Sequence, residues 1–265
     1  MAPALVVALS LTALAGSGGS GGCNPFEFWS AWGTLYTYAQ AGSNNDATKV
    51  PLSLAALLGG GAACSSSAGP PGASTSAQAN SSLSLLQGDF FGMECSALGH
   101  AQAAGSSAFA RSDINSTVVL TLPETRRVQG YWELHGSGIS DLSVTLKRID
   151  PWVTAVNADV STYITPQTIS GTVRLVLPAD SYQLQVYGSL QANVSFLNPD
   201  HGEYGGYLYL ACIQLADVDF DGSVTASDLS ALLAAWGPAP PLASADLNQD
   251  GAVDSVDLSI LLAAW

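Results

Sequence analysis

The residues with the clearest chemistry in this chain are aspartates that recur at every second position in two short segments near the C-terminus. The first segment reads DVDFDGSVTASD from Asp217, and the second reads DLNQDGAVDSVD from Asp246, 29 residues later. Both place oxygen-bearing side chains at positions 1, 3, 5 and 12 and glycine at position 6, which is the pattern of an EF-hand calcium loop. Because Ca²⁺ takes about six to eight oxygen ligands, the sequence predicts two calcium sites.

The predicted ligands are the side chains at positions 1, 3, 5 and 12 and the backbone carbonyl at position 7. They are Asp217, Asp219, Asp221, Ser223 and Asp228 in the first loop, and Asp246, Asn248, Asp250, Ala252 and Asp257 in the second. Aspartate at position 12 is shorter than the usual glutamate. The alternative is an acidic turn that binds nothing. It is disfavoured because crowded like charges repel by up to about 4 kcal/mol per pair at ~4 Å and an effective dielectric of ~20.

The segments around the loops predict one helix after each loop and none before it. Apolar residues follow each loop at helical spacing. A strand-like segment, GGYLYLACIQLA, precedes Asp217, and Pro238, Pro240 and Pro241 exclude a helix before Asp246. The apolar helix faces are expected to pack together as one small core; they carry Leu229, Leu232, Leu233 and Trp236 after the first loop, and Leu258, Leu261, Leu262 and Trp265 after the second.

Two calcium loops in tandem, each with only its exiting helix, resemble the type I dockerin module of secreted bacterial proteins. The resemblance covers residues 216–265, about a fifth of the chain. It implies a calcium-folded module that docks onto a cohesin domain, commonly to attach polysaccharide-degrading enzymes to a scaffold. The calcium ligands carry over residue by residue.

The positions that recognise cohesin depart from the pattern of this family. The family has Ser/Thr pairs at loop positions 10 and 11 and basic residues in the following helix. Here Ala226-Ser227 and Ser255-Val256 occupy those positions, and no Lys or Arg occurs from Asp217 onward. The resemblance therefore leaves open whether the partner is a cohesin-like or another cell-surface protein.

The charge of the chain excludes two classes of partner. The formal net charge is −14, and eight aspartates without a basic residue fall within residues 217–265. Such an acidic chain is unsuited to nucleic acid and to an anionic membrane surface.

The rest of the chain predicts a mainly β fold: an antiparallel β-sandwich, jelly-roll-like, over residues 30–215, followed by the small helical calcium-loop module at 216–265. Leu142, Val144 and Leu146 alternate with polar residues, as in a strand with one buried face. The segment LPADSYQLQV resembles a late-strand signature of extracellular sandwich domains, which implies a core or corner role for Tyr182.

The N-terminus and the cysteines indicate an extracellular or cell-surface protein. Residues 1–15 are apolar, too short to span a bilayer comfortably, and end in Ala13-Leu14-Ala15, which suits signal-peptide cleavage. A membrane anchor or a truncated gene start is the alternative. Residues 16–29 are assigned to a linker and an aromatic segment. Four cysteines in a secreted chain favour disulfides, here Cys23–Cys64 and Cys95–Cys212.

Three functions fit these features. The first is a non-catalytic protein whose sandwich binds an extracellular surface or polysaccharide while the calcium module docks it. The second is a polysaccharide-degrading enzyme of the glycoside hydrolase type with Glu133 and Glu203 as its acid and base. The sequence does not show that these carboxylates converge, and surface carboxylates are the favoured interpretation. The third is a structural surface protein in which calcium only folds the tail.

Overall fold

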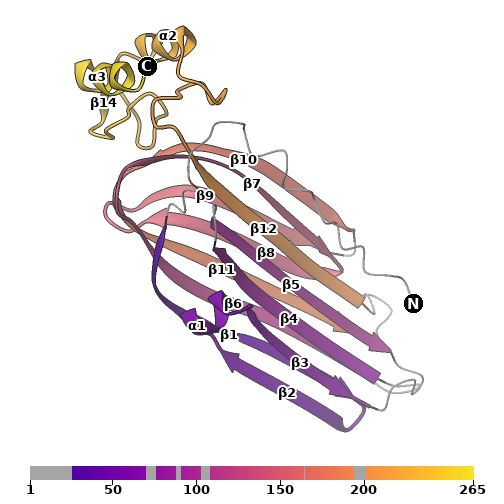
Figure 1. Cartoon of the computed structure of the whole chain (residues 1–265). Helices are drawn as coiled ribbons and strands as arrows, with labels where there is room; N and C mark the ends of the chain where they lie inside the picture. Colours follow the sequence, from indigo (N-terminus) through magenta and orange to yellow (C-terminus); the bar gives the residue numbers. More distant parts are fainter. Residues whose placement is uncertain (1–25, 70–75, 88–90, 103–107, 164, 194–200) are drawn as a thin grey trace.

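Two antiparallel sheets of six strands each pack face to face, and a small helical module follows them (Figure 1). The computed structural model describes residues 26–69, 76–87, 91–102, 108–163, 165–193 and 201–265. The predicted antiparallel β-sandwich followed by a small C-terminal helical module is therefore confirmed.

The first sheet has the strand order β2-β1-β6-β11-β8-β9, and the second has the order β10-β7-β12-β5-β4-β3. The strands of the first sheet are β1 (Glu27–Ala41), β2 (Asn44–Pro51), β6 (Ala108–Leu122), β8 (Ile139–Arg148), β9 (Val153–Thr162) and β11 (Asp180–Asn193). Those of the second are β3 (Ala62–Ala68), β4 (Ser76–Gln87), β5 (Phe91–Gln102), β7 (Arg126–Ser137), β10 (Gln167–Leu177) and β12 (His201–Ile213). A short helix, α1 (Leu54–Leu58), joins β2 to β3. The chain passes repeatedly from one sheet to the other, for example between β6, β7 and β8.

The core lies between the sheets because strand side chains alternate between the two faces. On β8, Leu142, Val144 and Leu146 are buried at 0–1% exposure, as their alternation predicts. A second cluster of buried apolar side chains consists of alanines in the part of the chain that the structure describes, namely Ala39, Ala41, Ala68, Ala77, Ala79, Ala101, Ala108, Ala110 and Ala192. Alanine fills little space, so the two sheets can approach closely there.

Tyr182 is a corner tyrosine, as its sequence context implies. Its side chain is fully buried, and its hydroxyl donates to the Pro178 carbonyl at 2.8 Å. Its ring meets Phe26 edge to face, with ring centres 5.9 Å apart. Tyr182 therefore ties the turn before β11 to the core.

The predicted disulfides are wrong because Cys64 and Cys95 are free thiols. Cys95 lies opposite Gly206 in the β5–β12 register, whereas Cys212 is six residues further along β12. Six strand residues span about 20 Å, and a disulfide needs Cα atoms within about 7 Å. The Cys64 thiol instead donates to the Thr48 carbonyl at 3.2 Å. Cys23 lies outside the described residues.

The C-terminal module contains α2 (Ala226–Ala234), α3 (Ser255–Ala263) and a two-stranded ribbon of β13 (Gly237–Pro238) and β14 (Ala252–Val253). Figure 1 shows it at the end of the sandwich where β12 ends. In the part of the chain that the structure describes, no helix is long and apolar enough to cross a membrane.

The small core of the module contains only part of the predicted helix faces. Leu232 and Leu261 are fully buried in it together with Val218 and Leu247. The expectation that all eight Leu and Trp positions pack inward is wrong for four of them, because Leu233, Trp236, Leu262 and Trp265 are 49–57% exposed. A nine-residue helix lying on a small core buries only a narrow stripe. Leu233 and Leu262 lie outside this stripe, and Trp236 and Trp265 lie beyond the ends of α2 and α3.

Candidate metal centre

The first loop folds its aspartates inward around backbone N–H groups. The Asp217 carboxylate is 1% exposed and accepts from the N–H groups of Asp221 at 3.1 Å and Gly222 at 2.9 Å. One carboxylate oxygen from each of Asp217, Asp219 and Asp221 lies within 4.8 Å of the others. Carboxylate oxygens gathered at this spacing are the hard donors that Ca²⁺ prefers.

The second loop repeats the same hydrogen bonds 29 residues later. Asp246 accepts from the N–H groups of Asp250 at 3.2 Å and Gly251 at 3.0 Å. The Asn248 side-chain oxygen accepts from the Asp250 N–H at 3.1 Å, and the Asp250 carboxylate accepts from the Ala252 N–H at 3.0 Å. The loop also has a bond that the first lacks, because the Asn248 amide donates to Asp250 at 2.9 Å. The two predicted ligand sets thus occupy equivalent frameworks.

The aspartates at position 12 join each loop to the helix that follows it. Asp228 is fully buried, and one of its oxygens accepts from the N–H groups of Val218 at 2.6 Å and Asp219 at 3.1 Å. Its other oxygen accepts from the Thr225 N–H at 2.8 Å, which completes a capping box at the start of α2. Asp257 does the same for Leu247, Asn248 and Asp254 at the start of α3. The shorter carboxylate therefore closes the loop and caps the helix at once.

The turns of both loops require left-handed backbone, and glycine supplies part of it. Gly222 and Gly251 have φ of 93° and 96°. Phe220 and Gln249, at position 4, have φ of 64° and 59°. A left-handed conformation at a non-glycine residue costs free energy, so the loop interactions must hold position 4 in place.

Both loops bury carboxylates. Burial raises the pKa of Asp217, and the neighbouring Asp228 carboxylate adds to the rise, while the N–H groups of Gly222 and Asp221 oppose it. Burial likewise raises the pKa of Asp246, with Asp257 adding to the rise. A divalent cation removes this penalty, so the chemistry of the donor set suits a calcium ion.

A comparison with known families supports this interpretation. Residues 215–264 match the family model of the dockerin type I domain. The C-terminal part of the chain is a dockerin-like module. The match covers both loops and both helices, α2 and α3. Nothing among the curated proteins matches the chain.

Solved structures resemble the chain only weakly. The Eiger TNF protein from S. frugiperda is 13% identical over 36% of this chain and 64% of its own, with a TM-score of 0.24. A family 4 carbohydrate-binding module is 10% identical over 38% of this chain and 83% of its own, with a TM-score of 0.23. A variant of a family 29 carbohydrate-binding module is 13% identical over 41% and 72%, with a TM-score of 0.20. TM-scores this low support no conclusion about the fold or the function of this chain.

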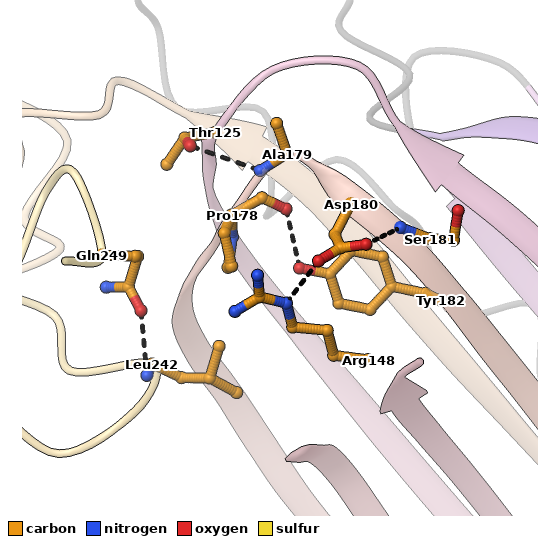
Figure 2. A network of polar contacts seen from close by, with 9 residues as sticks. All are labelled: Thr125, Arg148, Pro178, Ala179, Asp180, Ser181, Tyr182, Leu242 and Gln249. Atoms are coloured by element: carbon orange, nitrogen blue, oxygen red, sulfur yellow. Dashed lines mark hydrogen bonds and ion pairs between the residues drawn. The ribbon is translucent and has the colours of Figure 1, made fainter. Parts of the chain in front are cut away.

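The dockerin-like module contacts the sandwich next to the second loop of the module. Leu242, in the spacer between the repeats, is 8% exposed and belongs to the main core of the sandwich. Its N–H donates to the Gln249 side-chain oxygen at 2.9 Å (Figure 2). A cavity of about 170 Å³ lies at this junction; it is lined by Arg148, Pro151, Val153, Ala239, Pro241, Leu242, Asp246, Gln249, Asp250 and Gly251. Arg148 is paired with Asp180 at 2.7 Å in the same region (Figure 2).

The two glutamates considered for catalysis lie on the outer face of the second sheet without meeting. Glu133 on β7 is opposite Tyr207 of β12, and Glu203 is four residues from Tyr207 along β12. Four strand residues span about 13 Å, more than the roughly 5–9.5 Å that a pair of glycosidase carboxyl groups requires.

Sequence reasoning missed a tyrosine cluster on this face. The Tyr131 and Tyr207 rings have centres 5.9 Å apart, and those of Tyr207 and Tyr209 are 5.1 Å apart. The hydroxyl of Tyr131 donates to Glu133 at 3.2 Å, and that of Tyr209 donates to Glu94. The YLY pattern of β12 signals that Tyr207 and Tyr209 share a face, but Tyr131 joins them only through the strand register.

Proposed function

We propose that this is a secreted, non-catalytic protein whose dockerin-like module binds two calcium ions and attaches the protein to a partner, while its sandwich binds polysaccharide. The observation that carries the proposal is the pair of equivalent loops, each with inward-turned carboxylates and a buried aspartate at position 12. The ligands are the ten residues predicted from the two loops. The proposed domain boundaries are 26–215 for the sandwich and 216–265 for the module, after a signal peptide at residues 1–15. The sandwich begins before the expected residue 30, because β1 starts at Glu27 and Phe26 is buried in the core.

Calcium titration of the full chain by calorimetry tests the metal sites. Two binding events are expected, and Asp219→Asn should weaken one while Asn248→Ala weakens the other. A matched control is Asp46→Asn, which removes a carboxylate far from the module in sequence. Absence of heat from calcium in the wild-type protein would refute the metal part of the proposal.

Docking is supported by the apolar side chains that the module leaves in solvent. Leu233, Trp236, Val256, Leu262 and Trp265 are 46–57% exposed on or next to α2 and α3. Charged groups are few on these helices, so a partner would be recognised mainly by apolar contact. Surface plasmon resonance against cohesin domains, with calcium and with chelator, tests this. Binding that is lost in chelator and in Trp236→Ala supports docking, whereas no calcium-dependent signal contradicts it.

Polysaccharide binding is supported by the tyrosine cluster on the second sheet. Sugar rings stack on flat aromatic side chains, and carboxylates accept hydrogen bonds from sugar hydroxyls. The Tyr209 ring lies against the β5 backbone, since a Cβ on Gly92 would come within 3.0 Å of two of its atoms. Affinity electrophoresis in gels containing neutral polysaccharides should show retardation that Tyr207→Ala reduces. The control is Trp152→Ala, which removes an aromatic side chain outside the tyrosine cluster that is 67% exposed.

The enzymatic alternative makes a separate prediction. A glycoside hydrolase of this design requires Glu133, so a hydrolysis screen of wild type against Glu133→Gln distinguishes the two. We expect no hydrolysis from either protein, because Glu133 accepts from Tyr131 on an open sheet face and is not paired with Glu203. Release of reducing sugar by the wild type alone would overturn the non-catalytic assignment.

A further inference from the structure

Arg127 is the second residue of β7, and its side chain is fully buried. It lies opposite Ile213, the last residue of β12, in the strand register. The chain leaves the sandwich at Ile213 and enters the dockerin-like module. A buried guanidinium requires hydrogen-bond acceptors and opposite charge, and the module supplies both.

The guanidinium joins equivalent points of the two repeats. Arg127 Nε donates to the Leu215 carbonyl at 2.7 Å, and its Nη2 donates to the Ser244 carbonyl at 2.5 Å. These carbonyls stand two residues before Asp217 and Asp246, so they occupy the same position in each repeat. The planar fork of an arginine can bond two such carbonyls at once. One side chain of the sandwich thus fixes the entrances of both calcium loops.

The same side chain also contacts the first loop itself. The Arg127 guanidinium lies over the Phe220 ring at 4.8 Å, and a third donor, Nη1, reaches the Val218 carbonyl at 3.5 Å. Phe220 is at loop position 4 and has a left-handed backbone. The module has no Lys or Arg from Asp217 onward, so the positive charge near its carboxylates comes from the sandwich. Arg174 lies over the same Phe220 ring at 5.5 Å, and Arg148 lines the cavity with Asp246 and Asp250, but Arg127 is the arginine that bonds backbone carbonyls of both repeats. Arg127 therefore favours the curled loop before a metal ion arrives.

We propose that Arg127 is a positioning residue that makes the sandwich and the dockerin-like module one cooperative folding unit, so that calcium bound in the module stabilises the sandwich. This proposal rests on one part of the proposed function, namely that the two loops bind calcium. A ligand that binds only the folded state stabilises everything that unfolds with its site. Without the arginine link, only the packing of Leu242 in the sandwich core would still couple the two parts, and less of the stabilisation by calcium would reach the sandwich.

Scanning calorimetry of the full chain, with chelator and with calcium at about 100 times its Kd, tests the proposal. The wild type should show one main transition that calcium raises by roughly 10–20 °C, the shift expected for two such sites in a chain of this size. Arg127→Met should split it into a calcium-dependent module transition and a sandwich transition that calcium moves much less, since Leu242 is then the main remaining contact between the two parts. A merely structural role would lower the melting temperature and leave the calcium shift of the sandwich intact, which would overturn the proposal.

Two further variants separate the causes. Arg126→Met is the matched control, since the Arg126 side chain is 42% exposed and pairs with Glu124 at 2.7 Å; it should keep the wild-type calcium shift. Phe220→Leu removes the cation–π contact but keeps the carbonyl bonds, and should reduce the shift without abolishing it.

Hydrogen exchange of the wild type provides the test if Arg127→Met does not fold. Calcium should slow exchange at core amides of β7 and β12 under conditions where these amides exchange through global unfolding. Unchanged exchange there despite calorimetric calcium binding would refute the coupling and leave the metal sites standing. Absence of calcium binding would refute the metal sites and the coupling together.

Discussion

Asp228 and Asp257 each combine two tasks in one buried carboxylate. Each accepts from two N–H groups at the start of its loop and from the N-cap residue of the following helix. Three N–H donors compensate part of the cost of burying the charge. Loop closure and helix start are therefore coupled through a single residue in each repeat.

Asp228→Asn should remove one calcium site. The amide keeps the shape of the side chain but loses the charge. Its NH₂ group is a donor and cannot accept from the Thr225 N–H, so this hydrogen bond is lost. We expect calorimetry to give one site instead of two and the free energy of unfolding to fall by about 1 kcal/mol through the lost cap. Asp257→Asn should affect the other site equally. Asp159→Asn, at an exposed side chain of the edge strand β9, should change neither.

The buried aspartates at position 1 predict opposite pH responses with and without calcium. The raised pKa of Asp217 and Asp246 means that the folded, calcium-free state binds protons more tightly than the unfolded chain. Stability from this source is fully present below the unfolded pKa, about 3.9, and is lost as the pH rises through the raised folded pKa. In chelator, melting of the helical circular dichroism signal should therefore shift to lower temperature as the pH rises from about 4.

Calcium should reverse this response because it binds ionised carboxylates. In excess calcium the same melting temperature should rise over the same pH range. Parallel curves in calcium and chelator would contradict the assignment of Asp217 and Asp246 as ligands.

At the scale of elements, the strand period explains why Cys95 is inaccessible. It alternates inward on β5, a strand with neighbours on both sides, and burial raises the pKa of its thiol to about 12. The nucleophilic thiolate is therefore scarce at neutral pH.

The helix starts are set by single residues next to them in the sequence: Ser53 caps α1, and Thr225 and Asp254 cap α2 and α3.

Cys95 should resist alkylation in the folded protein. Treatment with iodoacetamide at pH 8, followed by peptide mass spectrometry, should leave the peptide with Cys95 unlabelled until denaturant is added. The physical reason is the joint effect of burial and raised pKa. Rapid labelling of native protein at this residue would show that β5 opens locally.

At the scale of the whole molecule, the spacer between the calcium repeats is part of the sandwich. Leu242 is 8% exposed and packs in the main core although it lies 29 residues beyond the end of β12. The cavity at the second loop adjoins this contact. The module is thus attached at Leu242 as well as at Arg127.

Leu242→Ala should destabilise the sandwich even though it changes the module. Emptying a buried leucine site costs about 2–5 kcal/mol, measurable by urea denaturation followed through intrinsic fluorescence. Leu233→Ala, at a side chain 51% exposed on α2, should change the free energy of unfolding by no more than about 0.5 kcal/mol. Equal effects of the two substitutions would contradict the packing of Leu242 in the sandwich core.

The sequence by itself determined the features that depend on local spacing. The loop pattern, the exiting helices, the absence of entering helices and the corner role of Tyr182 all follow from residues close together in the chain. A calcium loop holds its predicted ligands within twelve residues, and alternation along β8 is a property of one strand.

Only the tertiary structure decided which distant residues meet. Strand register separates Cys95 from Cys212 and Glu133 from Glu203, and it brings Tyr131 to Tyr207. The contact of Arg127 with Leu215 and Ser244 spans 88 and 117 residues of sequence. Such contacts depend on how two sheets and a module pack together, and no periodicity within one segment specifies that packing.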